Sequence, residues 1–277
     1  MSARALLALL LGGTLLAAGG AAVRRAALSA PGDPPRSIAD QAGAQDLESL
    51  NAPYDGRLHF VRIRYTPEGR GGGFDFGRGR GRGGREPAWA HDFPRGERNF
   101  MKIINETTYI HPLVDGSNVL TFDDPRLFQY PIAYIVEVGS WNPTDPEVAG
   151  LSAYLQKGGF LIVDDFRDLW NLENFAAQMQ RVLPGVQLVE LDGTHEIFDS
   201  FFRVDPHLVI PPYGPQTPVW YGIFEGNDPS KRLMAIVNYD NDLSEYWEYS
   251  DRGYYPIDLS NEAYKLGVNY IIYALTH

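Results

Sequence analysis

The clearest fold signal in the sequence is the run Tyr154-Leu155-Gln156-Lys157-Gly158-Gly159-Phe160-Leu161-Ile162-Val163-Asp164-Asp165-Phe166. Gly158 can adopt the left-handed conformation that ends a helix, and the apolar run after it is typical of a strand covered on both faces. Ligands of open α/β sheets gather at the carboxyl ends of such strands. We therefore expect Asp164 and Asp165 to lie at the edge of the sheet where a functional site would form.

Helical and strand patterns alternate on both sides of this run. We expect strands within 58–65, 132–138, 186–191 and 233–237, and helices within 99–108, 144–157, 172–183 and 261–274. Thr144 and Glu147 have the spacing of a capping box, which marks the start of one helix. This alternation predicts an α/β fold with a mainly parallel sheet and helices on both faces. We expect one domain over 54–277, with irregular insertions at 66–95 and 205–230.

The N-terminal part has a different composition. Arg4, an apolar run from Ala5 to Ala18 and small residues after it have the pattern of a secretory signal over 1–23. The alternative is a retained anchor over 5–23, which is almost long enough to span a bilayer. Either way we expect an exported protein, periplasmic or extracellular. Residues 24–53 are typical of a flexible spacer, and the Gly/Arg-rich segment 69–85 of a disordered loop.

Composition excludes several classes of function. The formal charge of −11 argues against nucleic acid and anionic membranes as partners, so we expect membrane contact only through the N-terminal segment. The absence of cysteine excludes disulfides, thiolate metal sites and thiol nucleophiles. The sequence also lacks a GxSxG elbow, a P-loop, a dinucleotide fingerprint and an HExxH motif.

Three polar stretches follow expected strands and are candidates for chemistry. As catalytic residues we predict Asp164, Asp165 and His195, and as ligand-binding residues Asp168, Glu196, Asn241, Asp242 and Trp247. The structural alternatives are aspartates that accept backbone N–H groups, a histidine that anchors a loop, and a packed aromatic lid. We expect one of the two central aspartates to face a cleft with His195 and the other to bond backbone amides. No cofactor is expected, but carboxylates in this pattern can hold a divalent cation.

The stretches quoted above also carry a family resemblance. The central run resembles the helix, Gly-Gly, strand and elbow of class I glutamine amidotransferase-like domains, including the trehalose-utilisation (ThuA-like) branch. Residues 54–277 resemble more closely a bacterial family of exported proteins of unknown function with that flavodoxin-like fold. This similarity rests on Phe60-Val61-Arg62-Ile63-Arg64-Tyr65, Tyr130-Pro131, Gly158 to Phe166, His195-Glu196-Ile197-Phe198, Asn241-Asp242 and Leu266-Gly267-Val268-Asn269-Tyr270.

This chain differs from the glutamine amidotransferases at one position that matters for function. A class I glutaminase carries its nucleophilic cysteine after this strand, where this chain has Asp164-Asp165, so the thioester route is closed. The resemblance implies a cell-envelope role beside MoxR-type ATPases and von Willebrand factor A-type proteins. We therefore favour a non-catalytic binding or assembly module. The alternatives are a sugar-related or metal-assisted hydrolase that uses Asp164, Asp165 and His195, and a carbohydrate-binding module built on aromatic residues 246–255.

Overall fold

The computed structural model describes residues 51–66, 87–214 and 216–277. The predicted signal or anchor, the Gly/Arg-rich loop and all but the last residues of the predicted spacer lie outside these ranges. Within them, contacts with the sheet begin at Asn51, whose side-chain amide pairs with the backbone of Val119 at 2.8 and 2.6 Å. No helix in the described ranges is long and apolar enough to cross a membrane.

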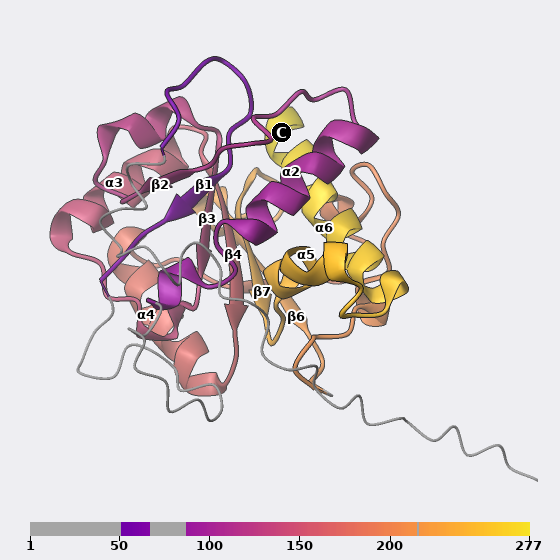
Figure 1. Ribbon diagram of the computed structural model, residues 1–277. Helices are drawn as coiled ribbons and strands as arrows, with labels where there is room; N and C mark the ends of the chain where they lie inside the picture. Colours follow the sequence, from indigo (N-terminus) through magenta and orange to yellow (C-terminus); the bar gives the residue numbers. More distant parts are fainter. Residues whose placement is uncertain (1–50, 67–86, 215) are drawn as a thin grey trace, which may run out of the picture. The chain divides into compact units, whose positions relative to one another are not determined.

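Seven strands form one sheet in the order β2-β1-β3-β4-β7-β6-β5 (Figure 1). Strands β2, β1, β3, β4 and β7 are parallel, β6 is antiparallel to β7, and β5 is antiparallel to β6. The predicted α/β fold with a mainly parallel sheet is therefore confirmed. The strands are β1 (Val61–Ile63), β2 (Asn118–Leu120), β3 (Ile132–Val136), β4 (Phe160–Phe166), β5 (Val189–Glu190), β6 (Val219–Phe224) and β7 (Leu233–Tyr239).

Helices cover both faces of the sheet, as expected for a parallel sheet that must be shielded from water. Helices α3 (Asp145–Gln156) and α4 (Leu169–Val182) cover one face, and α2 (Arg95–Thr107), α5 (Leu243–Tyr249) and α6 (Ile257–Thr276) cover the other (Figure 1). Short 3-10 turns lie at Ala88–Ala90, Pro125–Gln129, Val138–Ser140, Glu196–Phe198, Pro206–Leu208, Glu225–Asn227 and Ser250–Arg252.

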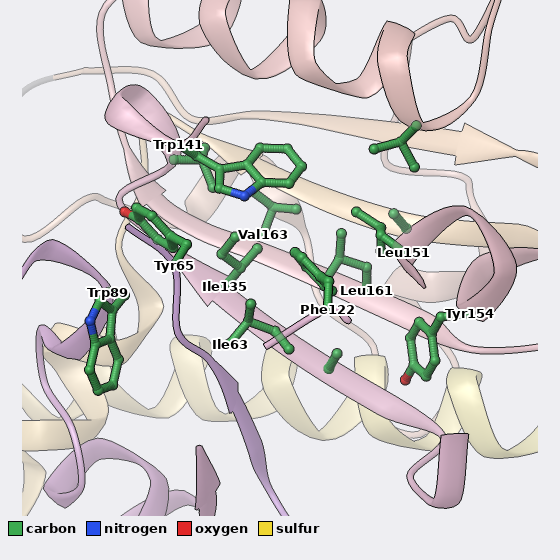
Figure 2. Packing of buried hydrophobic residues seen from close by; sticks show 14 of the residues in the cluster. Ile63, Tyr65, Trp89, Phe122, Ile135, Trp141, Leu151, Tyr154, Leu161 and Val163 are labelled. Carbon is green, nitrogen blue, oxygen red and sulfur yellow. The ribbon is translucent and has the colours of Figure 1, made fainter. Parts of the chain in front are cut away.

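Alternation along the central strands fills two separate cores. In β4, Leu161 and Val163 pack beneath α3 and α4, whereas Phe160 and Ile162 pack beneath α2 and α6. Figure 2 shows the first core, in which Leu161, Val163 and Ile135 lie among the large rings of Phe122, Trp141 and Tyr154. The near-continuous apolar runs of β3 and β4 follow from burial on both faces.

The helix that precedes β4 begins and ends as its sequence predicts. The Thr144 hydroxyl accepts the Glu147 amide, and the Glu147 carboxylate accepts the Thr144 amide at 2.8 Å, which completes the capping box. At the other end, Gly158 has φ of 106°, a conformation that only glycine adopts without strain. Helix α3 also passes close to the chain before it, because a Cβ on Gly150 would lie 2.0 Å from the Phe122 carbonyl oxygen.

The sequence patterns missed three elements. Residues 205–230, expected to be an irregular insertion, contain β6, and β2 was not predicted. Strand β2 is short, and β6 is interrupted by a glycine at its centre, so neither gives a strong period-2 signal. The aromatic stretch after β7 forms helix α5 over Leu243–Tyr249.

Candidate functional site

A β-bulge at the end of β4 separates the roles of the two adjacent aspartates. Val163 pairs with Val237 but Phe166 pairs with Tyr239, so β4 holds one residue more than β7 over this span. Asp165 is that extra residue and has φ of 50°, and Phe166 instead of Asp165 continues the row of Leu161 and Val163 into the core. The bulge thereby turns Asp165 out of the regular pleat.

Asp164 keeps its regular position and binds backbone and side-chain donors. Its Oδ2 accepts the Tyr134 hydroxyl at 2.6 Å and the backbone amides of Leu243 and Ser244 at 2.9 and 3.3 Å. Its Oδ1 accepts the Asn238 side-chain amide at 3.2 Å. Asp164 is fully buried, and it ties the start of α5 to the centre of the sheet. It takes the amide-bonding role that was predicted for one aspartate of the pair.

Asp165 lies in a pocket and pairs with a histidine that the sequence analysis did not select. The Asp165 Oδ2 lies 2.7 Å from Nδ1 of His91, and the same Nδ1 lies 3.7 Å from Oδ2 of Asp92. The residues on either side fix this segment, because Trp89, Ala90 and Phe93 are all buried in the core. Asp165 thus takes the pocket-facing role that was predicted for the other aspartate of the pair.

Four side chains converge where β4 and β7 end. One potential ligand atom from each of His91, Asp92, Asp165 and Asp242 lies within 4.8 Å of all the others, and we call this group the His91 cluster. The three aspartates are only 3–4% exposed, whereas the His91 side chain is 37% exposed. The Ser244 hydroxyl donates to Asp92 Oδ2 at 2.6 Å, and Asp242 Oδ1 accepts the Glu245 amide at 2.9 Å. The other oxygen of Asp92, Oδ1, is buried and has no hydrogen-bond partner.

The backbone around the cluster is strained. The non-glycine residues with positive φ in the described ranges are Asp92, Glu137, Asp165, Asp168, Asn227 and Asp240. All of them except Asn227 belong to the His91 cluster or lie at or beside the ends of β3, β4 and β7. Each such residue costs about 1–3 kcal/mol and persists only where the surrounding structure enforces its conformation, and such residues concentrate at functional sites.

A second acidic group shares Asp92 with the first. Ligand atoms of Asp92, Glu245 and Glu248 also lie within 4.8 Å of one another, and we call this the α5 group. Glu245 and Glu248 stand one turn apart on α5, and Asp242 at the N-cap has the same spacing, so all three acids share one helix face. The Tyr255 hydroxyl donates to Glu245 Oε1 at 2.6 Å.

Burial of so many carboxylates shifts their pKa values. Burial, with repulsion from Asp165 and Asp92, raises the pKa of Asp242 well above its usual value. Burial and nearby carboxylates raise the pKa of Glu245 to about 7 and those of Glu248 and Glu137 to about 8. Burial alone would lower the pKa of His91, but Asp92 and Asp165 outweigh it and raise that pKa well above its usual value.

The cluster opens into a pocket of about 260 Å³ with aromatic walls. The Arg167 guanidinium lies over the Tyr213 ring at 4.1 Å from its centroid, and both residues line the pocket. The lining is completed by Pro212, Tyr249, Tyr255, Glu245 and the His91 cluster residues His91, Asp165 and Asp242. A ligand in this pocket would therefore meet both carboxylates and aromatic rings.

The structure places His195 and Glu196 at the opposite edge of the sheet, so the expectation that His195 shares a cleft with the aspartates is wrong. The His195 ring lies 5.7 Å from that of Phe224, where β6 ends, and 6.1 Å from that of Tyr273. Tyr273 in turn packs on Phe160, the first residue of β4. Glu196 lies beside His277, at 3.6 Å. The physical reason is a turn at Asp192, whose carboxylate accepts the Thr194 amide and reverses the chain after β5.

Of the predicted ligand-binding residues, only Asp242 lines the pocket. Trp247 is buried and stacks on Phe100 at 4.3 Å between ring centroids, so its face is not available to a sugar. Asn241 is fully buried and bridges to Phe166, and neither polar atom of its side chain has a hydrogen-bond partner. Asp168 is exposed and precedes α4.

His91, Asp92, Glu245 and Glu248 were not selected from the sequence. The signal for the last two was present, since Asp242, Glu245 and Glu248 are spaced by three residues in a stretch that forms a helix. His91-Asp92 gave no comparable signal, because it follows no predicted strand and adjoins the Gly/Arg-rich segment.

Comparison with known proteins identifies a family but no activity. Residues 60–275 match the profile of a domain of unknown function, DUF4159. No curated protein matches the chain.

Proposed function

Because the chain belongs to the DUF4159 family, which brings no assigned activity with it, we propose from the site itself that this protein binds a divalent cation at the His91 cluster. The observation that carries the proposal is the convergence of one imidazole and three carboxylates within 4.8 Å at the carboxyl ends of β4 and β7. Oxygen and imidazole donors together suit Mn²⁺, Zn²⁺ and Fe²⁺.

The distances within the cluster fit neighbouring ligands of one ion. Ligand bonds of about 2.0–2.2 Å put adjacent ligand atoms about 3–3.5 Å apart and opposite ones about 4.3 Å apart. His91 Nδ1 lies 2.7 Å from Asp165 Oδ2 and 3.7 Å from Asp92 Oδ2, and the widest spacing in the cluster is below 4.8 Å. The closest pair would have to separate by about 0.3 Å and the widest to close by about 0.5 Å at most to reach the spacings of bound ligands.

Charge balance supports the same proposal. Three buried aspartates in the cluster face one imidazole, and burying carboxylates without compensation is unfavourable. The raised pKa values of His91 and Asp242 mean that protons supply part of the missing positive charge. A dication would replace those protons and remove the repulsion.

Cation binding is tested with the purified full-length chain after EDTA treatment. Titration with Mn²⁺ at pH 7.5 should raise the melting temperature, since an ion at 100 times its dissociation constant adds about 2.7 kcal/mol of stability. Asp165→Asn and Asp242→Asn should abolish this rise. Asp115→Asn, a change of the same kind at an exposed position, should keep it. A wild-type chain that binds neither Mn²⁺ nor Zn²⁺ would overturn the proposal.

A second candidate function is cation-assisted hydrolysis, which the open pocket favours. Catalytic metal sites keep a coordination position for water or substrate, whereas structural sites are closed. Here the 260 Å³ pocket is lined by three residues of the cluster. Release of p-nitrophenol from simple phosphate and carboxylate esters, dependent on Mn²⁺ and lost in Asp242→Asn, would support hydrolysis. Binding of Mn²⁺ without turnover of any ester would leave the non-catalytic binding module as the better function.

Location and partners stay proposals that rest on the sequence and its resemblance. For an exported protein, intact-mass analysis of a periplasmic fraction should show a chain that begins beyond Ala18; a chain that begins at Met1 or Ser2 supports the anchor.

For an envelope assembly role, the observation in favour is the exposure of two large apolar side chains at the start of α4, Leu169 at 64% and Trp170 at 75%. Trp170→Ala should weaken binding to a purified von Willebrand factor A-type partner, and Tyr109→Ala, at a ring that is even more exposed, should not.

A further inference from the structure

We infer that the site holds two divalent cations, bridged by Asp92, with the second ion bound by the α5 group of Asp92, Glu245 and Glu248. This inference rests on the proposed function, because it adds a second ion beside the one at the His91 cluster. The two sets of ligand atoms share a single residue, and each set is compact enough for one ion, with all atoms within 4.8 Å.

Asp92 has the geometry of a bridging carboxylate. Its Oδ2 accepts the Ser244 hydroxyl and lies 3.7 Å from His91 Nδ1, so this oxygen belongs to the His91 cluster. Its Oδ1 is buried without a hydrogen-bond partner, although Asp92 is only 4% exposed. A buried carboxylate oxygen without a donor is unfavourable, because it has lost its water and gained nothing in return. An ion in the α5 group would supply the missing partner.

The α5 group lacks a positive charge of its own. It consists of three carboxylates whose ligand atoms lie within 4.8 Å of one another. Carboxylates at this spacing repel one another, and a cation between them would remove that repulsion. Tyr255 holds Glu245 in place through its hydroxyl at 2.6 Å, so the group is positioned before any ion binds.

The two ions would differ in preference, because the two ligand sets differ. The His91 cluster contains an imidazole, which suits Zn²⁺ and Mn²⁺, whereas the α5 group offers only oxygen atoms, which suit Mn²⁺, Mg²⁺ and Ca²⁺. Paired ions that share a carboxylate lie about 3.5–4 Å apart and can hold the attacking and leaving oxygens of a displacement reaction. Mn²⁺ fits both sets and is therefore the probe for the test.

The experiment is a count of Mn²⁺ bound per full-length chain after equilibrium dialysis, with the electron paramagnetic resonance spectrum recorded on the same samples. We expect two ions with a spin-coupled spectrum in the wild type. Glu248→Gln should leave one uncoupled ion, with the second bound at least about 100-fold more weakly. Asp165→Asn should also leave one uncoupled ion, and Asp92→Asn should weaken both. Glu173→Gln, at an exposed position of α4, should keep two. Excess Mg²⁺ should displace one of the two.

The outcomes separate the inference from the proposed function. The wild type could bind one Mn²⁺ that is lost in Asp165→Asn and kept in Glu248→Gln. This result would overturn the inference of a second ion and would leave the proposed site at the His91 cluster in place. No bound Mn²⁺ would overturn both. Two ions that persist in Glu248→Gln and in Glu245→Gln would show that the second ion binds elsewhere. Circular dichroism of each variant establishes that it folds, and Glu245→Gln replaces Glu248→Gln if the latter does not.

Discussion

Replacing Asp164 and Asp165 one at a time by alanine should give different effects on stability, with a clear loss only for Asp164, although the two residues are adjacent. Four donors point at Asp164, of which the Tyr134 hydroxyl at 2.6 Å and the Leu243 amide at 2.9 Å make the shortest bonds. Each buried donor left without a partner costs about 1–3 kcal/mol, so these two alone cost about 2–6 kcal/mol. Part of this stability cost is offset, because burying the Asp164 carboxylate is itself unfavourable and the variant removes it. The unfavourable burial is evident in the pKa of Asp164, which it raises to about 6.

We therefore expect Asp164→Ala to lose about 3 kcal/mol of unfolding free energy, or roughly 6–12 °C in melting temperature for a domain of this size. Asp165→Ala should keep its stability within about 1 kcal/mol or gain some, because it removes a charge that repels Asp242. The hydrogen bond that His91 loses can be replaced by water, since that ring is 37% exposed.

The assay is urea unfolding at pH 7 in EDTA, followed by circular dichroism, with Mn²⁺ titration of the folded variants afterwards. Asp165→Ala should remain folded and lose Mn²⁺ binding. The reasoning about the bulge is refuted if the two variants lose equal stability, or if Asp164→Ala loses less than about 1 kcal/mol.

Three further predictions concern pH, packing and chemistry. Without metal, the free energy of unfolding should fall as pH rises from about 5 to 8, because Glu245, Glu248 and Glu137 bind protons more tightly in the folded chain, with pKa values of about 7, 8 and 8. Saturating Mn²⁺ should make this dependence on pH weaker. A melting temperature that rises over this pH range in EDTA would contradict the charge balance. Gly150→Ala should lower the free energy of urea unfolding by about 1–3 kcal/mol, because the new Cβ would lie 2.0 Å from the Phe122 carbonyl oxygen. An unchanged urea midpoint would show that α3 can move away from Phe122. Glutamine should yield no ammonia above a heat-killed control, since the chain has no cysteine, and clear turnover would require another nucleophile.

Local signals in the sequence predicted the central elements because those signals are complete within a few residues. The capping box at Thr144 and Glu147, the left-handed Gly158 and the apolar run of β4 each need no distant partner to be interpreted. The same run predicted one aspartate that bonds amides, as Asp164 does, and one that faces a cleft with His195, which lies at the other edge of the sheet instead. It could not say which one, because that choice depends on the bulge against β7.

The sequence by itself determined the α/β class, the strand that carries the aspartates and the exclusion of thiol chemistry. Only the tertiary structure decided which side chains meet Asp165. His91 and Asp92 come from a segment more than seventy residues earlier, and their approach depends on how α2 and α5 pack on the sheet. His195 looked equivalent in sequence because it also follows a strand, but the turn at Asp192 sends it to the other edge. Proximity in space arises from long-range packing, and a sequence pattern that spans a few residues does not contain it.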